Sequence, residues 1–321
     1  MKLTSIMLEQ GPVPAALLTT NTLVDLSAAS KLNLLGPAPL QNLSDIVNLD
    51  GTLFNQVKNL VQRLENYEPG PQKLLQSNKA FHDASTVRYS TILRPHVLLA
   101  CGMAYKDHMR EMNTPIPKKP AGFLKSPNSI IANGDPIILP STDPNMVDFE
   151  CELACVIGRP LYNVQPEDVL KHIAGFTMIN ELGSRSHVRA WLNAMEGTNP
   201  KECIELFMAT AQDKQLPSFC PMGPVIETFD TFGDVNQFSI ETKLNGEIMQ
   251  SADSSDLIFT IAESLAYFSR WYKLMPGDVY STGSPSGVGY ARTPQRLLRD
   301  GDIVEVSCPK IGCLSNPVVS V

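Results

Sequence analysis

Two glutamates at the start of an apolar segment are the residues that most directly suggest chemistry in this sequence. The segment 153–157 is apolar and ends at Gly158, which is typical of a buried strand. Because side chains alternate along a strand, Glu150 and Glu152 point to the same face. Two like charges there repel each other and lose hydration, and a hard divalent cation such as Mg²⁺, Mn²⁺ or Ca²⁺ removes both penalties. Alone, such a pair is more often a solvated strand face, so other residues must support a metal site.

A third acid and a histidine–glutamate pair are further candidates. Glu181 follows the apolar segment 174–179, so it stands at the end of a second strand and could complete a set of metal ligands. His108 and Glu111 are three residues apart, which places them on one side of a helical turn. A carboxylate fixes the tautomer of a neighbouring histidine and makes it a competent general base. Each feature also has an ordinary structural explanation, as the first residue of a helix or as a surface cap.

Two loops contain groups suited to an anionic substrate. Lys214 lies in a loop rich in turn formers, where it either neutralises a substrate anion or is simply exposed. The small-residue loop 281–289 offers backbone N–H groups and hydroxyls to an anion. It is not a phosphate-binding loop of the nucleotide-hydrolase type, because it lacks the Gly-Lys-Ser/Thr ending and a helix directly after it.

The elements that must position these residues fall into two regions. Apolar spacing predicts strands at 2–8 and 16–18 and helices at 53–66, 166–172 and 255–271. The chain becomes strand-rich after about residue 90 and is interrupted there by glycine and proline turns. We therefore predict a small N-terminal domain, 1–90, and a larger β-dominated domain, 91–321.

Composition narrows the class of protein without naming a function. The 321 residues are 43% hydrophobic and carry a net charge of −7, with no lysine- or arginine-rich run, so nucleic acid is not an expected partner. No apolar stretch reaches the length of a membrane span, and the N-terminus does not resemble a signal peptide. The seven cysteines are an odd number without zinc-like spacing, which indicates reduced thiols in a cytoplasmic protein.

Taken in their order along the chain, these features resemble the fumarylacetoacetate hydrolase family, with the likeness running from about residue 95 to residue 321. The segments that show the resemblance are 102–111, 123–129, 148–152, 180–185, 214 with 221–224, 244–247, and 276–289.

The resemblance implies a fold, a cofactor and a set of site residues. The fold is α+β and β-dominated, a mixed β-roll or β-sandwich with a small N-terminal α/β cap domain, and the protein is expected to form a homodimer. The metal ligands are expected to be Glu150, Glu152 and Glu181, holding Mg²⁺ or else Mn²⁺ or Ca²⁺. The catalytic residues are expected to be His108, Glu111 and Lys214. The substrate-binding residues are expected to be Tyr105, Lys125, Arg185, Lys214, Thr282 and Gly283.

The family's chemistry suggests a small-molecule substrate that is a 2-oxo-acid or a 1,3-dicarbonyl compound. The main expectation is hydrolysis of a C–C bond in a β-diketone or acylpyruvate, through an enolate stabilised by the cation. Decarboxylation of an oxaloacetate-type 2-oxo-acid and keto–enol isomerisation run through the same species and stay open. A non-catalytic binding protein on this fold is a further alternative.

Several positions depart from the family's pattern. Glu181 stands where the family has an aspartate, Val188 replaces a glutamine, and Pro217 replaces an aspartate. The connection 189–213 is also longer than usual. We expect these changes to enlarge the pocket and to favour a bulkier, more apolar acyl group.

Overall fold

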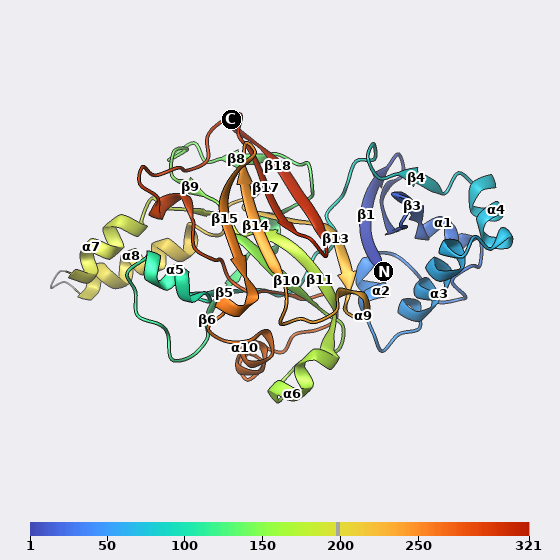
Figure 1. Ribbon diagram of the computed structural model, residues 1–321, viewed down its shortest axis with the longest axis horizontal. Coiled ribbons are helices and arrows are strands. Elements are labelled where there is room, and N and C mark those ends of the chain that lie inside the picture. Colours follow the sequence, from blue (N-terminus) through green and yellow to red (C-terminus); the bar gives the residue numbers. More distant parts are fainter. Residues whose placement is uncertain (197–199, 321) are drawn as a thin grey trace.

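Strand β10 (Cys151–Ile157) lies inside the fold with both of its faces covered, which explains its almost unbroken apolar sequence. Leu153 and Cys155 pack on one face with residues of a second sheet, whereas Ala154 and Val156 pack on the other face with helices near the N-terminus. The structure is a computed structural model that describes residues 1–196 and 200–320 (Figure 1).

The largest sheet has eleven strands, and β10 lies between β11 and β16. Ten strands cross it in the order β4 (Phe81–Asp83), β3 (Thr22–Asp25), β2 (Gly11–Leu17), β1 (Lys2–Leu8), β13 (Cys220–Thr228), β11 (Ile173–Asn180), β10, β16 (Val279–Ser281), β5 (Leu98–Gly102) and β6 (Ala121–Lys125). The short strand β7 (Ile130–Ile131) pairs with β13. The β5–β16 and β7–β13 pairs are parallel and the others antiparallel, so the sheet is mixed.

A second sheet packs against β10 and β11 and closes a sandwich. Its five strands are, in order, β15 (Glu247–Asp253), β14 (Ser239–Leu244), β17 (Ile303–Cys308), β18 (Gly312–Ser320) and β8 (Ile137–Leu139). A two-stranded ribbon is formed by β9 (Val147–Asp148) and β12 (Gly183–Ser184). The helices of this region are α5 (Lys106–Glu111), α6 (Pro166–Val169), α7 (Val188–Glu196), α8 (Pro200–Gln212), α9 (Phe229–Phe232) and α10 (Ile261–Phe268), with 3₁₀ turns η1 (Pro127–Ser129), η2 (Leu170–His172), η3 (Ser254–Asp256) and η4 (Gly289–Ala291).

The N-terminal region continues the large sheet through β1, which pairs with β13 at Lys2↔Glu227 and Leu3↔Ile226. Its helices are α1 (Leu26–Lys31), α2 (Leu43–Val47), α3 (Leu53–Glu65) and α4 (Pro69–Ser77). Figure 1 shows this region at one end of the long axis and helices α7 and α8 at the other. The large sheet contains strands from both sides of residue 90. The domain boundary expected at that residue therefore stays a prediction.

The sheet-dominated α+β fold agrees with the sequence prediction. Strand β1 and helix α3 appear where the spacing predicted them, whereas the predicted helix at 255–271 is shorter. That helix begins only at Ile261, because Thr260 and Glu263 form a capping box that fixes its start. The cysteines, all of them in the described part of the chain, form no disulfide, as expected for reduced thiols.

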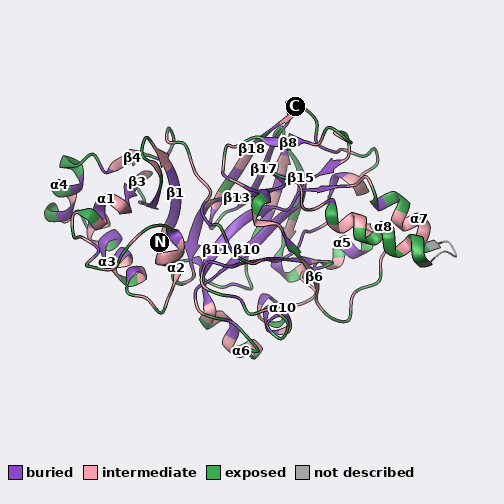
Figure 2. Ribbon diagram, turned by 180° about the vertical axis from the view of Figure 1, so that it is seen from behind, coloured by how far each residue is buried: buried purple, intermediate pink, exposed green. Residues whose placement is uncertain are grey.

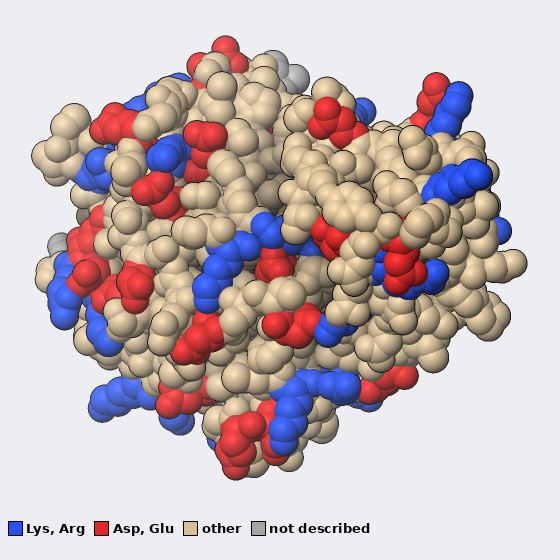
Figure 3. Space-filling model, turned by 45° about the vertical axis from the view of Figure 1, so that its right-hand side comes forward, with Lys and Arg blue, Asp and Glu red and all other residues tan. Residues whose placement is uncertain are grey.

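The surface mixes charges of both signs. Figure 3 shows Lys and Arg side chains interspersed with Asp and Glu on one face, without a continuous basic area on that face. Figure 2 shows that the most buried residues lie in the central strands, including β10, β11 and β13. No described helix combines the length and the apolar character that crossing a membrane requires.

The loop that follows β16 approaches other backbone so closely that it requires glycine. Gly287 has a φ of +96°, and a Cβ atom there would lie 2.3 Å from the carbonyl oxygen of Met249. Its N–H donates to Glu111 Oε1 over 2.8 Å. The loop is therefore fixed between the second sheet and helix α5.

We predict that Gly287→Ala distorts this loop. The left-handed φ and the backbone clash together should lower the free energy of unfolding by roughly 2–4 kcal/mol in urea denaturation. Gly134→Ala is the matched control, because Gly134 also has a positive φ, +84°, but nothing lies within 4 Å of its added Cβ. Equal losses for the two variants would show that close approach at Gly287 is unimportant.

Candidate metal and active site

Pairing between β10 and β11 brings the three predicted metal ligands together. Cys151 pairs with Asn180, so Glu150 and Glu181 meet just beyond the ends of the two strands. The Glu181 N–H donates to the Glu150 carbonyl over 2.8 Å, and the Glu150 N–H donates to Asn180 Oδ1 over 2.9 Å. One carboxylate oxygen from each of Glu150, Glu152 and Glu181 lies within 4.8 Å of the others, and all three residues are buried.

Glu152 differs from the other two glutamates in its partners, which are hydrogen-bond donors. Its Oε2 accepts hydrogen bonds from Ser281 Oγ and from the Gly283 N–H. Among the described residues, no cation lies within ion-pair distance of it. Burial, together with the negative charges of Glu181 and Glu150, raises the pKa of Glu152 well above its usual range.

Glu150 has the opposite environment. Lys214 Nζ lies 2.8 Å from Glu150 Oε2, and an Arg185 nitrogen donates to Glu150 Oε1 over 2.6 Å. Burial opposes ionisation, but these two cations outweigh it and lower the pKa of Glu150 to about 2. Glu150 is therefore ionised.

Glu181 lies between two lysines. Lys125 Nζ lies 2.6 Å from Oε1 and Lys214 Nζ lies 2.5 Å from Oε2. Lys125 is fully buried and also donates to the carbonyl oxygens of Leu182 and Lys214. The two carboxylate oxygens of Glu181 are thus each paired with a different lysine.

The donor set fits a hard divalent cation. The buried cluster contains four carboxylates and three cations, namely Asp148, Glu150, Glu152 and Glu181 against Lys125, Arg185 and Lys214. A cation that holds oxygen ligands at about 2.0–2.6 Å brings them within roughly 5 Å of one another, as these oxygens already are. Each carboxylate oxygen has a second lone pair, so a cation can bind alongside the existing hydrogen bonds.

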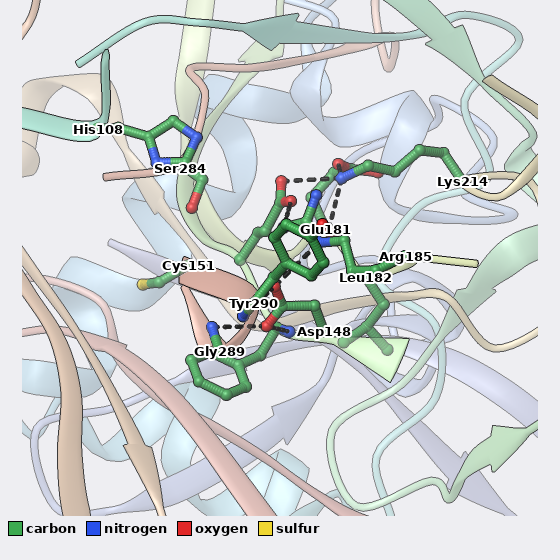
Figure 4. Close-up of polar contacts among 12 residues, drawn as sticks. His108, Asp148, Cys151, Glu181, Leu182, Arg185, Lys214, Ser284, Gly289 and Tyr290 are labelled. Carbon is green, nitrogen blue, oxygen red and sulfur yellow. Dashed lines mark hydrogen bonds and ion pairs between the residues drawn. The ribbon is translucent and has the colours of Figure 1, made fainter. Parts of the chain in front are cut away.

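Asp148 is a site residue that the sequence analysis did not single out. It is fully buried and accepts hydrogen bonds from Arg185 Nε and from the N–H groups of Gly289 and Tyr290 (Figure 4). It thus fixes the Arg185 guanidinium relative to the loop after β16. Its only sequence signal was its place in the segment 148–152.

The histidine–glutamate pair forms as predicted on α5. His108 Nδ1 lies 3.1 Å from Glu111 Oε2, and Glu111 is fixed in turn by the Gly287 N–H. His108 lies close enough to Glu150 to contribute to the lowering of its pKa. Figure 4 shows His108 on the same side of the site as Ser284.

Most of the residues predicted to bind substrate contact other groups of the protein in this structure. The hydroxyl of Thr282 donates to the Leu153 carbonyl, the Gly283 N–H donates to Glu152, and Lys125 is held by Glu181. Tyr105 differs, because its buried hydroxyl has no hydrogen-bond partner among the described residues. The substrate-binding roles of these residues stay predictions.

The lengthened connection folds as two helices. Val188, in place of the family's glutamine, begins α7, and 189–213 is occupied largely by α7 and α8. These helices project from the body of the molecule in Figure 1. The enlarged pocket expected from this segment stays a prediction.

Comparison with known proteins identifies the family. Residues 98–319 match the model described as "Fumarylacetoacetate (FAA) hydrolase C-terminal". The chain belongs to the fumarylacetoacetate hydrolase family. The match includes every residue of the cluster described above and the strands from β5 onward, whereas β1 to β4 of the large sheet lie outside it. It confirms the resemblance predicted from the sequence.

Several relatives share the family membership. The chain is 32% identical to "Oxaloacetate tautomerase fahd2, mitochondrial" from Xenopus laevis over 87% of this chain and 83% of that protein. It is 34% identical to "Oxaloacetate tautomerase YisK" from Bacillus subtilis over 72% of each chain. The structure of a fumarylacetoacetate hydrolase from Exiguobacterium antarcticum superposes with a TM-score of 0.76 and 26% identity, covering all of both chains.

These matches support the prediction that the protein is an enzyme. Enzymes of its family are commonly metal-dependent. The identity of the metal, the homodimer and the cytoplasmic location stay predictions from the sequence. Two kinds of reaction, hydrolysis and tautomerisation, occur in the relatives' descriptions. The choice between them depends on the site's own groups.

Two isosteric variants should separate the roles of the acids. In the presence of a chelator, Glu152→Gln should leave thermal stability unchanged or raised, since burial and the neighbouring carboxylates oppose ionisation of Glu152 and an amide oxygen can still accept from Ser281 and Gly283. Glu181→Gln should lower the free energy of unfolding by roughly 3 kcal/mol, because it leaves Lys125 buried without its counter-ion.

Both variants should bind Mg²⁺ or Mn²⁺ at least about tenfold more weakly in titration calorimetry, because each removes a ligand charge. Unchanged metal affinity in both would remove the case for a cation at this cluster.

Proposed function

We propose that this protein is a metal-dependent keto–enol tautomerase of a small 2-oxo-acid of the oxaloacetate type. The observation that carries the proposal is a histidine–glutamate pair beside a buried carboxylate cluster that has excess negative charge. This arrangement suits removal of a proton from a carbon next to a carbonyl group. Relatives along most of the chain are described as oxaloacetate tautomerases, which favours isomerisation among the reactions that the sequence left open.

Glu150, Glu152 and Glu181 would hold the divalent cation. When bound, it polarises the substrate carbonyl and stabilises the negative charge of an enolate. Burial, together with the negative charges of Glu181 and Glu150, raises the pKa of Glu152, and a divalent cation bound there would oppose these effects.

His108 would move the proton. Because Glu111 Oε2 lies 3.1 Å from Nδ1, that nitrogen carries the hydrogen and Nε2 keeps the lone pair. Nε2 would remove a proton from the carbon beside the carbonyl, and the electron pair of that C–H bond would form the C=C bond while the carbonyl π electrons move to oxygen. The protonated imidazole would then give the same proton to that oxygen, which completes the enol. The same proton transfers in reverse convert the enol to the keto acid. Substrate and product therefore contain the same atoms.

Lys214 and Arg185 would hold the substrate's carboxylate groups. Both cations lie at the cluster, and each is anchored by protein carboxylates that fix its position. A planar guanidinium suits a carboxylate, because it offers two parallel donors. Arg185 also lies 5.9 Å from the centre of the Tyr290 ring, which limits its movement on that side.

The direct test measures conversion of enol oxaloacetate to its keto form by ultraviolet absorbance, with added Mg²⁺ or Mn²⁺. The purified protein should accelerate this conversion, and a chelator should remove the acceleration. Release of pyruvate and CO₂ identifies decarboxylation instead, and cleavage of acylpyruvates identifies hydrolysis. Either of these as the main reaction, without tautomerisation, would refute the proposal.

We predict that His108→Gln lowers kcat by about two to four orders of magnitude, the usual contribution of a general base. Metal affinity should be unchanged, because His108 is not a proposed ligand. Lys106→Gln is a matched control on the same helix, since its amino group contacts the Ser255 carbonyl and not the cluster. A parallel loss of metal affinity and kcat in His108→Gln would make His108 a structural residue.

A further inference from the structure

Helices α7 and α8 form a hairpin that the proposed reaction does not explain. The hairpin connects two cations of the site, because Arg185 lies just before α7 and Lys214 lies just after α8. It also occupies the connection 189–213, which the sequence analysis expected to be longer than usual. Its attachment to the body of the protein therefore bears on how both cations are placed.

The hairpin itself makes little contact with the rest of the molecule. No residue in the ranges 189–195 and 201–212 is buried, and Figure 2 shows these helices mainly as exposed and intermediate surface. The rings of Trp191 and Phe207, 5.6 Å apart, join the two helices to each other. The position of the hairpin thus depends on the contacts at its base.

A histidine–aspartate pair joins the two ends of the hairpin, which form its base. His187 Nδ1 lies 3.0 and 3.1 Å from the two carboxylate oxygens of Asp213, and the His187 N–H donates to the same carboxylate over 3.4 Å. The Ser184 N–H donates to the Asp213 carbonyl over 3.1 Å. These contacts join the chain entering α7 to the chain leaving α8. Asp213 is buried, whereas His187 remains partly exposed.

The base of the hairpin leads directly into Lys214. Asp213 precedes Lys214 directly, and the Lys214 side chain runs over the bare backbone of Gly183, where an added Cβ would lie 2.7 Å from Lys214 Cε. From there Nζ reaches Glu150 and Glu181. A shift of Asp213 would therefore move Nζ relative to both carboxylates.

We propose that His187 and Asp213 are a positioning pair that sets the placement of Lys214 and, through the chain from 185 to 187, of Arg185. This role rests on the proposed function, in which both cations hold the substrate. Because a carboxylate can only accept, the contact places the imidazole hydrogen on Nδ1 and makes His187 the donor.

The test compares His187→Ala with His187→Asn. Alanine removes the donor, whereas the asparagine amide can supply one near the position of Nδ1. In the tautomerase assay, His187→Ala should raise KM by roughly 10- to 100-fold with a smaller change in kcat, because a misplaced binding cation weakens ground and transition states alike. His187→Asn should recover most of the loss, and Mg²⁺ affinity should be the same in both variants. His96→Ala, at an exposed histidine outside the cluster, is the control.

A double-mutant cycle then asks whether His187 acts through Lys214. Binding of oxalate, a small dicarboxylate, is measured by calorimetry with Mg²⁺ present. His187→Ala should weaken binding in the wild-type background and weaken it clearly less in Lys214→Met, where only the effect through Arg185 remains, whereas fully additive effects would overturn the proposal. A fall in kcat at unchanged KM, or no recovery with asparagine, would also overturn it.

Hydrogen exchange separates this proposal from the proposed function. The amides of Ser184 and Asp213 should exchange at least about tenfold faster in His187→Ala than in the wild type, with no substrate present. Unchanged exchange refutes the pair. A wild-type protein without tautomerase activity but with this exchange difference refutes the proposed function and leaves the structural role of the pair supported.

Discussion

Buried negative charge at the ends of β10 and β11 is the constraint on which the rest of the site depends. Three glutamates and one aspartate lie out of water within one cluster. A buried carboxylate without compensation either takes up a proton or destabilises the fold. The neighbouring loops and strands supply that compensation as hydrogen-bond donors and cations, and they thereby fix the geometry in which substrate chemistry can occur.

The sandwich creates this constraint because it covers both faces of β10. Cys151 and Leu153 pack toward the second sheet, so Glu150 and Glu152 must point to the opposite side. Water cannot hydrate them there freely, and each therefore needs protein partners. The compensation is uneven: Glu150 and Glu181 have cations, whereas the partners of Glu152 in the described part of the chain are two hydrogen-bond donors. That unevenness is what makes a divalent cation a natural component of the site.

The loop after β16 connects the two halves of the chemistry. Gly283 and Ser281 bind Glu152, Gly287 binds Glu111, and Gly289 binds Asp148. A single run of small residues thus fixes a proposed metal ligand, the carboxylate paired with the proposed general base, and the acid that orients Arg185. Residues without bulky side chains are needed because the backbone of this loop passes so near to its neighbours.

The sequence by itself determined the local features of this protein. Strand alternation placed Glu150 and Glu152 on one face, and helical spacing placed His108 beside Glu111, because both features depend on residues near one another in the chain. The order of the motifs identified the family, because it is a property of the whole sequence. Only the tertiary structure decided which charges meet. Lys125 and Glu181 are 56 positions apart, and Ser281 and Glu152 are 129 apart, so their pairing depends on strand order. For the same reason, the central place of Asp148, the protein partners of Thr282 and Gly283, and the contact of His187 with Asp213 appear only when the sheets bring distant loops to the ends of β10 and β11.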